Sequence, residues 1–203
     1  MSLERVSSTP AAGYHAAMPR THSELKREVK VGALVEAAER RLREGGYEAL
    51  SVAGIARELG LAQNAVYWYF PTKDHLFVAA LQRLSARLIK RKPRQRPVVE
   101  EIIWFVDRLS ELQAIRRALD ERARVSPVVR DFEHDHRAGM RAMLRNAIAG
   151  SVVAADLDTV TDALLATLEG VLLLRLARRE RDRIVRFTFS SLVSQQTGAT
   201  RRD

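Results

Sequence analysis

The sequence predicts an all-α protein of about nine helices, and three observations favour this fold class. Apolar residues recur at helical spacing along most of the chain, and no stretch of useful length alternates with the period of two that a strand requires. The apolar residues are mainly Ala and Leu, which favour helix over sheet. Only 6 Pro and 10 Gly interrupt the 203 residues, so few positions break a helix.

The N-terminal part of this pattern predicts four helices. The first begins near Ser23, which can cap it, and ends at Gly45–Gly46, because glycine tolerates the left-handed C′ position. Two short helices follow, over residues 51–59 and 62–70, with a turn at Gly60 between them. Pro71 ends the second short helix, and Thr72 can cap a fourth helix that runs to about residue 92.

The rest of the chain predicts a linker and further helices. Residues 91–97 are basic and bounded by proline, and helical patterns follow over residues 98–122, 127–149, 156–178 and 180–196. Residues 1–22 are small and lack periodicity, so we expect a disordered arm there. The predicted organisation is an arm at 1–22, an N-terminal helical domain at 23–72, a connecting helix at 73–92 and a C-terminal domain at 93–203.

Composition narrows the class of protein. The net charge of +9 favours an anionic partner, and the excess of positive charge per residue is larger over residues 23–92 than beyond them. Cysteine is absent, which fits a reducing cytoplasm. We expect no secretory signal in residues 1–22 and no membrane span, because the longest apolar run, near 163–176, is interrupted by Glu169 and Arg175.

The segment over residues 46–76 carries the clearest functional signal. Two short helices joined by a glycine-containing turn have the lengths of a helix-turn-helix. The second short helix should expose Gln63, Asn64, Tyr67 and Trp68, whose amides can pair with an adenine edge and whose tyrosine hydroxyl can donate to a phosphate. Lys73 follows in the first turn of the next helix, where the helix dipole disfavours a cation unless an anion such as phosphate is bound.

The same segment resembles the DNA-binding domain of TetR-family regulators. The resemblance covers about residues 30–77 and rests on residues at fixed spacing: Gly46-Tyr47, Ser51-Val52, Ile55-Ala56, Leu59-Gly60 and residues 66–76. It implies three N-terminal helices with the third in the major groove, followed by a helical ligand-binding and dimerisation domain. It also implies a homodimer on double-stranded DNA with a near-palindromic operator.

The resemblance assigns roles by position. Gln63, Asn64 and Ala65 stand at positions that usually face bases, whereas Tyr67, Tyr69 and Lys73 stand where the family usually contacts phosphate. Ser51 would cap the second helix and can also touch phosphate. The chain departs from the family pattern at Ala62, where a capping Ser or Thr is common, and at Tyr69, where His is frequent, so the operator sequence is not predictable.

The last two predicted helices are the candidates for a dimer interface. Residues 157–176 are apolar on more than one face, which predicts burial on two sides, one against this chain and one against a partner. The resemblance likewise implies dimerisation through the last two helices. The predicted dimerisation residues are Leu157, Val160, Leu164, Leu168, Val171, Val185, Phe189 and Leu192.

The middle helices hold the candidates for a ligand pocket. Met and aromatic residues make adaptable apolar linings, although most such residues are ordinary core. We expect an apolar or amphipathic small-molecule effector and no cofactor or metal. The candidate lining residues are Trp104, Phe105, Leu109, Leu112, Phe132, Met140, Met143 and Leu144, with His134 and His136 as polar groups.

Three alternatives to a regulator have weaker support. Glu133 and His136 share a helical face as a fragment of a metal site, but no second pair and no catalytic motif accompany them, so we expect no enzyme. The basic stretch over residues 87–96 suits a membrane surface or DNA equally well. A sequence-indifferent binder would not need exposed Gln63 and Asn64. The expected function is a repressor released by a ligand, with a ligand-independent or activating DNA-binding protein as the alternative.

Overall fold

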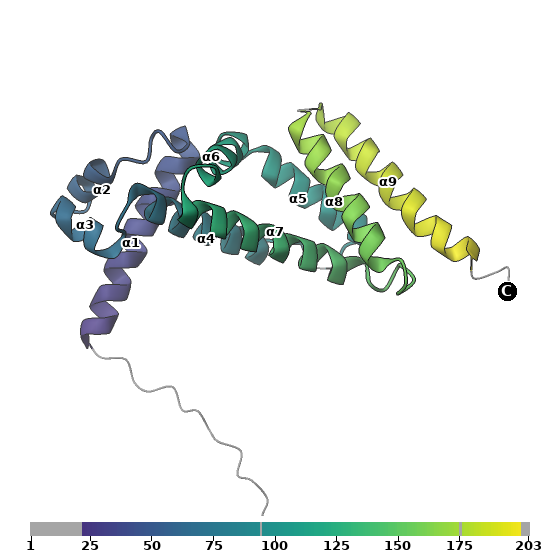
Figure 1. Cartoon of the computed structure of the whole chain (residues 1–203), viewed down its shortest axis with the longest axis horizontal. Coiled ribbons are helices and arrows are strands. Elements are labelled where there is room, and N and C mark those ends of the chain that lie inside the picture. Colours follow the sequence, from purple (N-terminus) through teal and green to yellow (C-terminus); the bar gives the residue numbers. More distant parts are fainter. Residues whose placement is uncertain (1–21, 94, 175, 200–203) are drawn as a thin grey trace, which may run out of the picture.

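The computed structural model describes residues 22–93, 95–174 and 176–199, and these residues form nine α-helices and no strand (Figure 1). The all-α fold class is therefore confirmed. The arm predicted at 1–22 lies outside the described residues except for His22, where the first helix begins. The helices are α1 His22–Gly45, α2 Val52–Glu58, α3 Gln63–Tyr69, α4 Lys73–Lys90, α5 Val98–Ser110, α6 Gln113–Ala123, α7 Pro127–Ile148, α8 Leu157–Leu173 and α9 Arg178–Ala199.

The prediction of a single helix over residues 98–122 is wrong, because α5 and α6 are separate helices. At Leu112 the backbone leaves helical geometry (φ −106°, ψ 24°), and its amide donates to the carbonyl of Leu109 at 3.1 Å. The Ser110 hydroxyl donates to the carbonyl of Asp107 at 2.7 Å, a local bond that competes with the helical ladder. The break lets Ile103 of α5 and Ile115 of α6 enter two different cores.

The first core joins α1–α4 to α6 and to the start of α7. Its largest fully buried side chain is Phe77 of α4, and Leu34, Leu42 and Ile55 bring α1 and α2 against it. Val129 of α7 is also fully buried here. The helices that resemble a DNA-binding domain are therefore packed onto the rest of the chain rather than tethered to it.

The second core lies at the opposite end of the molecule, where α8 and α9 are outermost (Figure 1). It consists of apolar residues from α5, the end of α7, α8 and α9, with Ile148, Leu164 and Val185 fully buried. Because α7 contributes to both cores, it runs between the two ends of the molecule (Figure 1).

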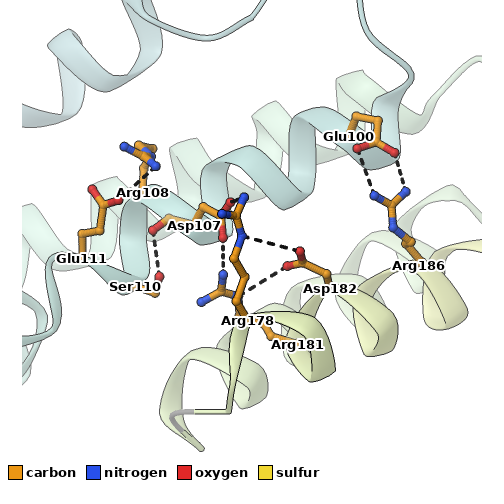
Figure 2. Close-up of polar contacts among 9 residues, drawn as sticks. All are labelled: Glu100, Asp107, Arg108, Ser110, Glu111, Arg178, Arg181, Asp182 and Arg186. Carbon is orange, nitrogen blue, oxygen red and sulfur yellow. Dashed lines mark hydrogen bonds and ion pairs between the residues drawn. The ribbon is translucent and has the colours of Figure 1, made fainter.

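A polar seam fastens α9 to α5, as Figure 2 shows. Asp107 of α5 is 8% exposed and accepts hydrogen bonds from Arg178, at 2.7 Å, and from Arg181, which is itself 6% exposed. One turn and a half along α9, Arg186 makes two hydrogen bonds to Glu100. The seam orients α9, and so the outer face that α8 and α9 present.

Across the described ranges, no helix is both long and apolar enough to cross a membrane.

Candidate DNA-binding module and ligand cavity

Helix α3 is held by one face and presents the other to solvent. Val66 is fully buried and Phe70, at its C-cap, is 9% exposed, so these two side chains anchor the helix in the first core. The opposite face exposes the residues predicted to contact DNA. Gln63, Asn64, Tyr67 and Trp68 are exposed, whereas Ala65 and Tyr69 are half-buried.

The two short helices begin differently. Ser51 caps α2, because its Oγ accepts from the amide of Gly54 at 3.1 Å, and the side chain remains exposed. Ala62 at the N-cap of α3 makes no side-chain hydrogen bond, as its methyl group requires. Gly60, between the helices, has φ +64°, a conformation that other residues rarely adopt.

Lys73 lies at the first residue of α4, with its ammonium 4.0 Å from the centre of the Tyr47 ring. The Tyr47 hydroxyl donates to Asp74 at 2.7 Å, and Arg122 of α6 makes two hydrogen bonds to the same carboxylate. Burial alone would raise the pKa of Asp74. Hydrogen bonds from Arg122, Tyr47 and Ser126 outweigh burial and hold that pKa below its ordinary value.

This cluster was not predicted from the sequence, because its members are far apart in the chain. The pKa of Tyr47 is raised well above its ordinary value, mainly by burial and secondly by the hydrogen bond to Asp74. Its phenol therefore stays protonated. The cluster ties the start of α4, where Lys73 lies, to the end of α6.

A second unpredicted contact joins α1 to α3. The guanidinium of Arg27 lies 5.1 Å from the centre of the Trp68 ring, within the range of a cation–π interaction. Trp68 also meets Tyr69 edge to face, with ring centres 4.8 Å apart. Arg27 therefore adds a positive charge beside the exposed face of α3.

A cavity of about 180 Å³ lies among α5, α6, α7 and α8. It brings together several residues predicted as pocket lining. Apolar side chains dominate its wall, as expected for a small-molecule site. The predicted lining residues that it contains are Phe105, Leu109, His136, Met140, Met143 and Leu144.

A smaller cavity of about 70 Å³ adjoins the first and shares part of its wall. Phe132 and Leu112, both predicted, line this one. Trp104, also predicted as a lining residue, lines neither of these two cavities. It is half-exposed and packs edge to face on Phe105, with ring centres 5.1 Å apart, while His134 is exposed.

The wall of the larger cavity also contains charged and titratable side chains: Lys92, Glu101, Arg116, Asp120, Glu133, His136, Arg137 and Glu169. Burial lowers the pKa of His136, so its imidazole is neutral near pH 7, and it stacks on Phe132 with ring centres 5.5 Å apart. Glu133 pairs with Arg137 at 2.5 Å. Over the described parts of the chain, no three His, Asp or Glu side chains gather in a way that could hold a metal ion.

The residues predicted for dimerisation face inward in this chain. Five of them are buried in the second core, and Leu168, Phe189 and Leu192 pack against it. The stripe that we expected to meet a partner is thus the internal face of the last two helices. The five buried residues are Leu157, Val160, Leu164, Val171 and Val185.

Other apolar side chains of α8 and α9 are exposed instead. Leu173 is 80% exposed, Leu174 67% and Phe187 73%. On α8, Ala163 and Ala166 are also exposed and small. This exposed surface differs from the stripe of large apolar residues that the sequence predicted for dimerisation.

Comparison with known proteins gives a match over the N-terminal helices. The sequence profile of the family described as "Bacterial regulatory proteins, tetR family" matches residues 34–80, from the middle of α1 to the middle of α4. The transcriptional repressor KstR of Rhodococcus jostii is 42% identical over 48 residues, which is 24% of this chain and 23% of that protein. The nucleoid occlusion factor SlmA of Haemophilus influenzae is 35% identical over 48 residues, 24% of this chain and 22% of that protein. The matched part of this chain spans about a quarter of the length of these curated relatives.

Solved structures match over most of the chain. A TetR transcription regulator from Haloarcula marismortui superposes with a TM-score of 0.65 at 22% identity, covering 82% of this chain and 98% of that one. A putative transcriptional regulator from Saccharomonospora viridis, solved in complex with choline, has a TM-score of 0.59 at 19% identity, covering 78% and 94%. These likenesses extend the shared fold to the C-terminal helices. By sequence, residues 34–80 match the DNA-binding domain of the TetR family of transcriptional regulators, and by structure most of the chain shares the fold of the solved regulators.

Proposed function

We propose that the protein is a sequence-specific repressor, acting in the cytoplasm as a homodimer, that a small molecule releases from a near-palindromic operator. The exposed face of α3 is the observation that best supports recognition of a DNA sequence. Exposed Gln63 and Asn64 stand on a helix that buried Val66 holds in place, so their amides are offered to base edges on a rigid support.

We propose that residues around these two amides contact the phosphate backbone of the DNA. Tyr67 and Tyr69 would donate to phosphates, and Lys73 and exposed Ser51 would flank them. Lys73 now rests on the ring of Tyr47, from which its flexible stem can reach outward. Arg27 and Trp68 form the neighbouring edge of the same surface.

Two observations support regulation by a small molecule. The chain contains a cavity whose wall is mostly apolar, and the structurally similar regulator from Saccharomonospora viridis was solved with choline bound. We infer repression from KstR, a transcriptional repressor whose N-terminal segment is similar to that of this chain. A ligand can act only by favouring one of two conformations, so we propose that it favours the one whose α3 helices are wrongly spaced for the operator.

The dimer is proposed from the exposed apolar surface of α8 and α9. Leu173 and Leu174 at the end of α8 and Phe187 on α9 are large and exposed, and α8 and α9 are the outermost helices at one end of the molecule (Figure 1). Exposed apolar patches of this kind mark interaction sites. Exposed Ala163 and Ala166 would let a partner helix approach closely.

Selection of binding fragments from genomic DNA at physiological salt tests the proposal. Fragments that share an inverted repeat would support a sequence-specific dimer, whereas fragments with no common sequence would contradict it. On the selected site, Gln63→Ala and Asn64→Ala should relax preference at particular bases by about 1–3 kcal/mol. Lys73→Ala should weaken binding to all sequences and reduce its salt dependence. Gln82→Ala and Lys90→Ala, both exposed on α4, serve as matched controls.

A further inference from the structure

The wall shared by the two cavities contains an arginine without an ion-pair partner. Arg116 of α6 is half-buried and lines both cavities. Over the described ranges, every other buried or half-buried arginine forms an ion pair, and Arg116 forms none. The paired ones are Arg41 with Glu58, Arg83 and Arg87 with Glu39, Arg122 with Asp74, Arg141 and Arg145 with Asp158, and Arg181 with Asp107.

Four carboxylates, those of Glu101, Asp120, Glu133 and Glu169, line the larger cavity, but none of them forms an ion pair with Arg116. Glu101 is held by Lys92 at 2.6 Å, and Glu133 is held by Arg137 at 2.5 Å. Asp120 and Glu169 attract Arg116 electrostatically, but both are exposed to water and neither forms an ion pair with it. The guanidinium thus keeps its donors for another acceptor.

Desolvation makes this arrangement unfavourable in the empty cavity. Burial lowers the pKa of Arg116, the sign of a cation that has lost water, although an arginine keeps its charge at any physiological pH. A half-buried charge without a partner raises the free energy of the folded state, and a bound anion would remove that penalty. The planar fork of a guanidinium matches a carboxylate through two parallel hydrogen bonds.

The remainder of the wall specifies the other part of the ligand. Phe105, Leu109 and Met140 line both cavities beside Arg116, and the imidazole of His136 is neutral. We propose that this cavity binds an amphipathic monoanion, whose apolar body lies against these side chains and whose carboxylate-like head pairs with Arg116. The inference rests on the proposed effector function of the same cavity, and it names the chemical class of the effector.

Calorimetric titration of the full chain with decanoate and with decanol tests the anionic head. Decanoate should bind the wild-type protein, and Arg116→Met should weaken that binding about tenfold or more. Decanol should bind more weakly than decanoate to the wild-type protein and equally to both proteins. Arg117→Met, an exposed neighbour on α6 that lines neither cavity, should leave both affinities unchanged. Arg116→Lys should fall between, because it keeps the charge and loses the fork.

Three results would overturn the proposal: decanoate and decanol binding the wild type equally, Arg116→Met retaining full decanoate affinity, or neither compound binding. Thermal unfolding provides the control for folding, because Arg116→Met removes no ion pair and should not lower the melting temperature. Operator binding by the ligand-free wild type separates the two ideas. If the ligand-free protein binds its operator but decanoate does not bind the protein, the proposal of an anionic effector is wrong and the proposal of DNA binding stands. If the ligand-free protein does not bind an operator, the proposed function itself is wrong.

Discussion

Arg122 donates two hydrogen bonds to the carboxylate of Asp74, from Nε at 3.1 Å and from Nη2 at 2.7 Å. Asp74 is 7% exposed and adjoins Lys73 in the chain, whereas Arg122 lies near the end of α6. The pair therefore links the helix that borders the cavity to the helix that begins at the proposed DNA surface.

Asp74→Asn should lower the free energy of unfolding by about 2 kcal/mol near neutral pH, after allowance for the part-exposed arginine. The pKa of Asp74 is held below its ordinary value, so its contribution is complete above pH 3.8 and is lost as the pH falls below that value. Denaturant unfolding at neutral and acid pH should show the difference between wild type and variant shrinking in acid. Asp131→Asn, an exposed control, should show no such difference at either pH.

Asp107→Ala should destabilise the protein more than a surface charge deletion does. Removal of this carboxylate leaves buried Arg181 with only a longer contact to Asp182, at 3.8 Å, and this loss costs about 3 kcal/mol. Glu111→Ala, on the same stretch, breaks only the exposed pair with Arg108 and should change little (Figure 2). Chemical denaturation curves compare the two, and equal midpoints for both variants would show that the seam contributes no more than a surface pair.

Ala62→Ser should stabilise the start of α3. The present N-cap supplies no side-chain acceptor, and a serine there would accept from an amide of the first turn, a gain of about 1 kcal/mol. Thermal unfolding measures the gain. A variant that unfolds at or below the wild-type temperature would mean that serine does not cap this helix, and Ala53→Ser, within α2, serves as the control for an added hydroxyl.

Phe187→Glu should convert the proposed dimer into a monomer at micromolar concentration. A carboxylate on the exposed apolar surface would have to be desolvated in the interface. Sedimentation velocity measures the oligomeric state. Val125→Glu, at a position 68% exposed in the turn before α7, should remain a dimer. A monomeric wild type would contradict the interface outright.

The DNA-binding helices could be predicted from the sequence because their signals are local. Ser51, Gly60 and Pro71 mark helix boundaries through their own backbone preferences, and the apolar spacing around Val66 identifies the buried face of α3. The exposure of Gln63 and Asn64 follows from that face alone. No contact between distant parts of the chain is needed for these inferences.

The remaining features depend on which distant residues meet. Helical periodicity shows that residues 157–176 have more than one apolar face, but it cannot say which face meets α5 and α9, so the inward stripe was assigned to a partner. The split at Leu112 likewise contains no Pro or Gly to signal it. The lack of an ion pair at Arg116 also depends on packing, because Glu169 of α8 pairs with Arg137 of α7 and not with Arg116.

Helix α7 buries Val129 in one core and Ile148 in the other. With 22 residues it is about 33 Å long, so one continuous hydrogen-bonded rod forms a wall of both. Unfolding of either core would expose apolar side chains of α7 to water and so destabilise the other core. The two ends of the molecule therefore form one cooperative folding unit, and a ligand that slows opening near the cavity would also slow amide exchange in the helices that read DNA.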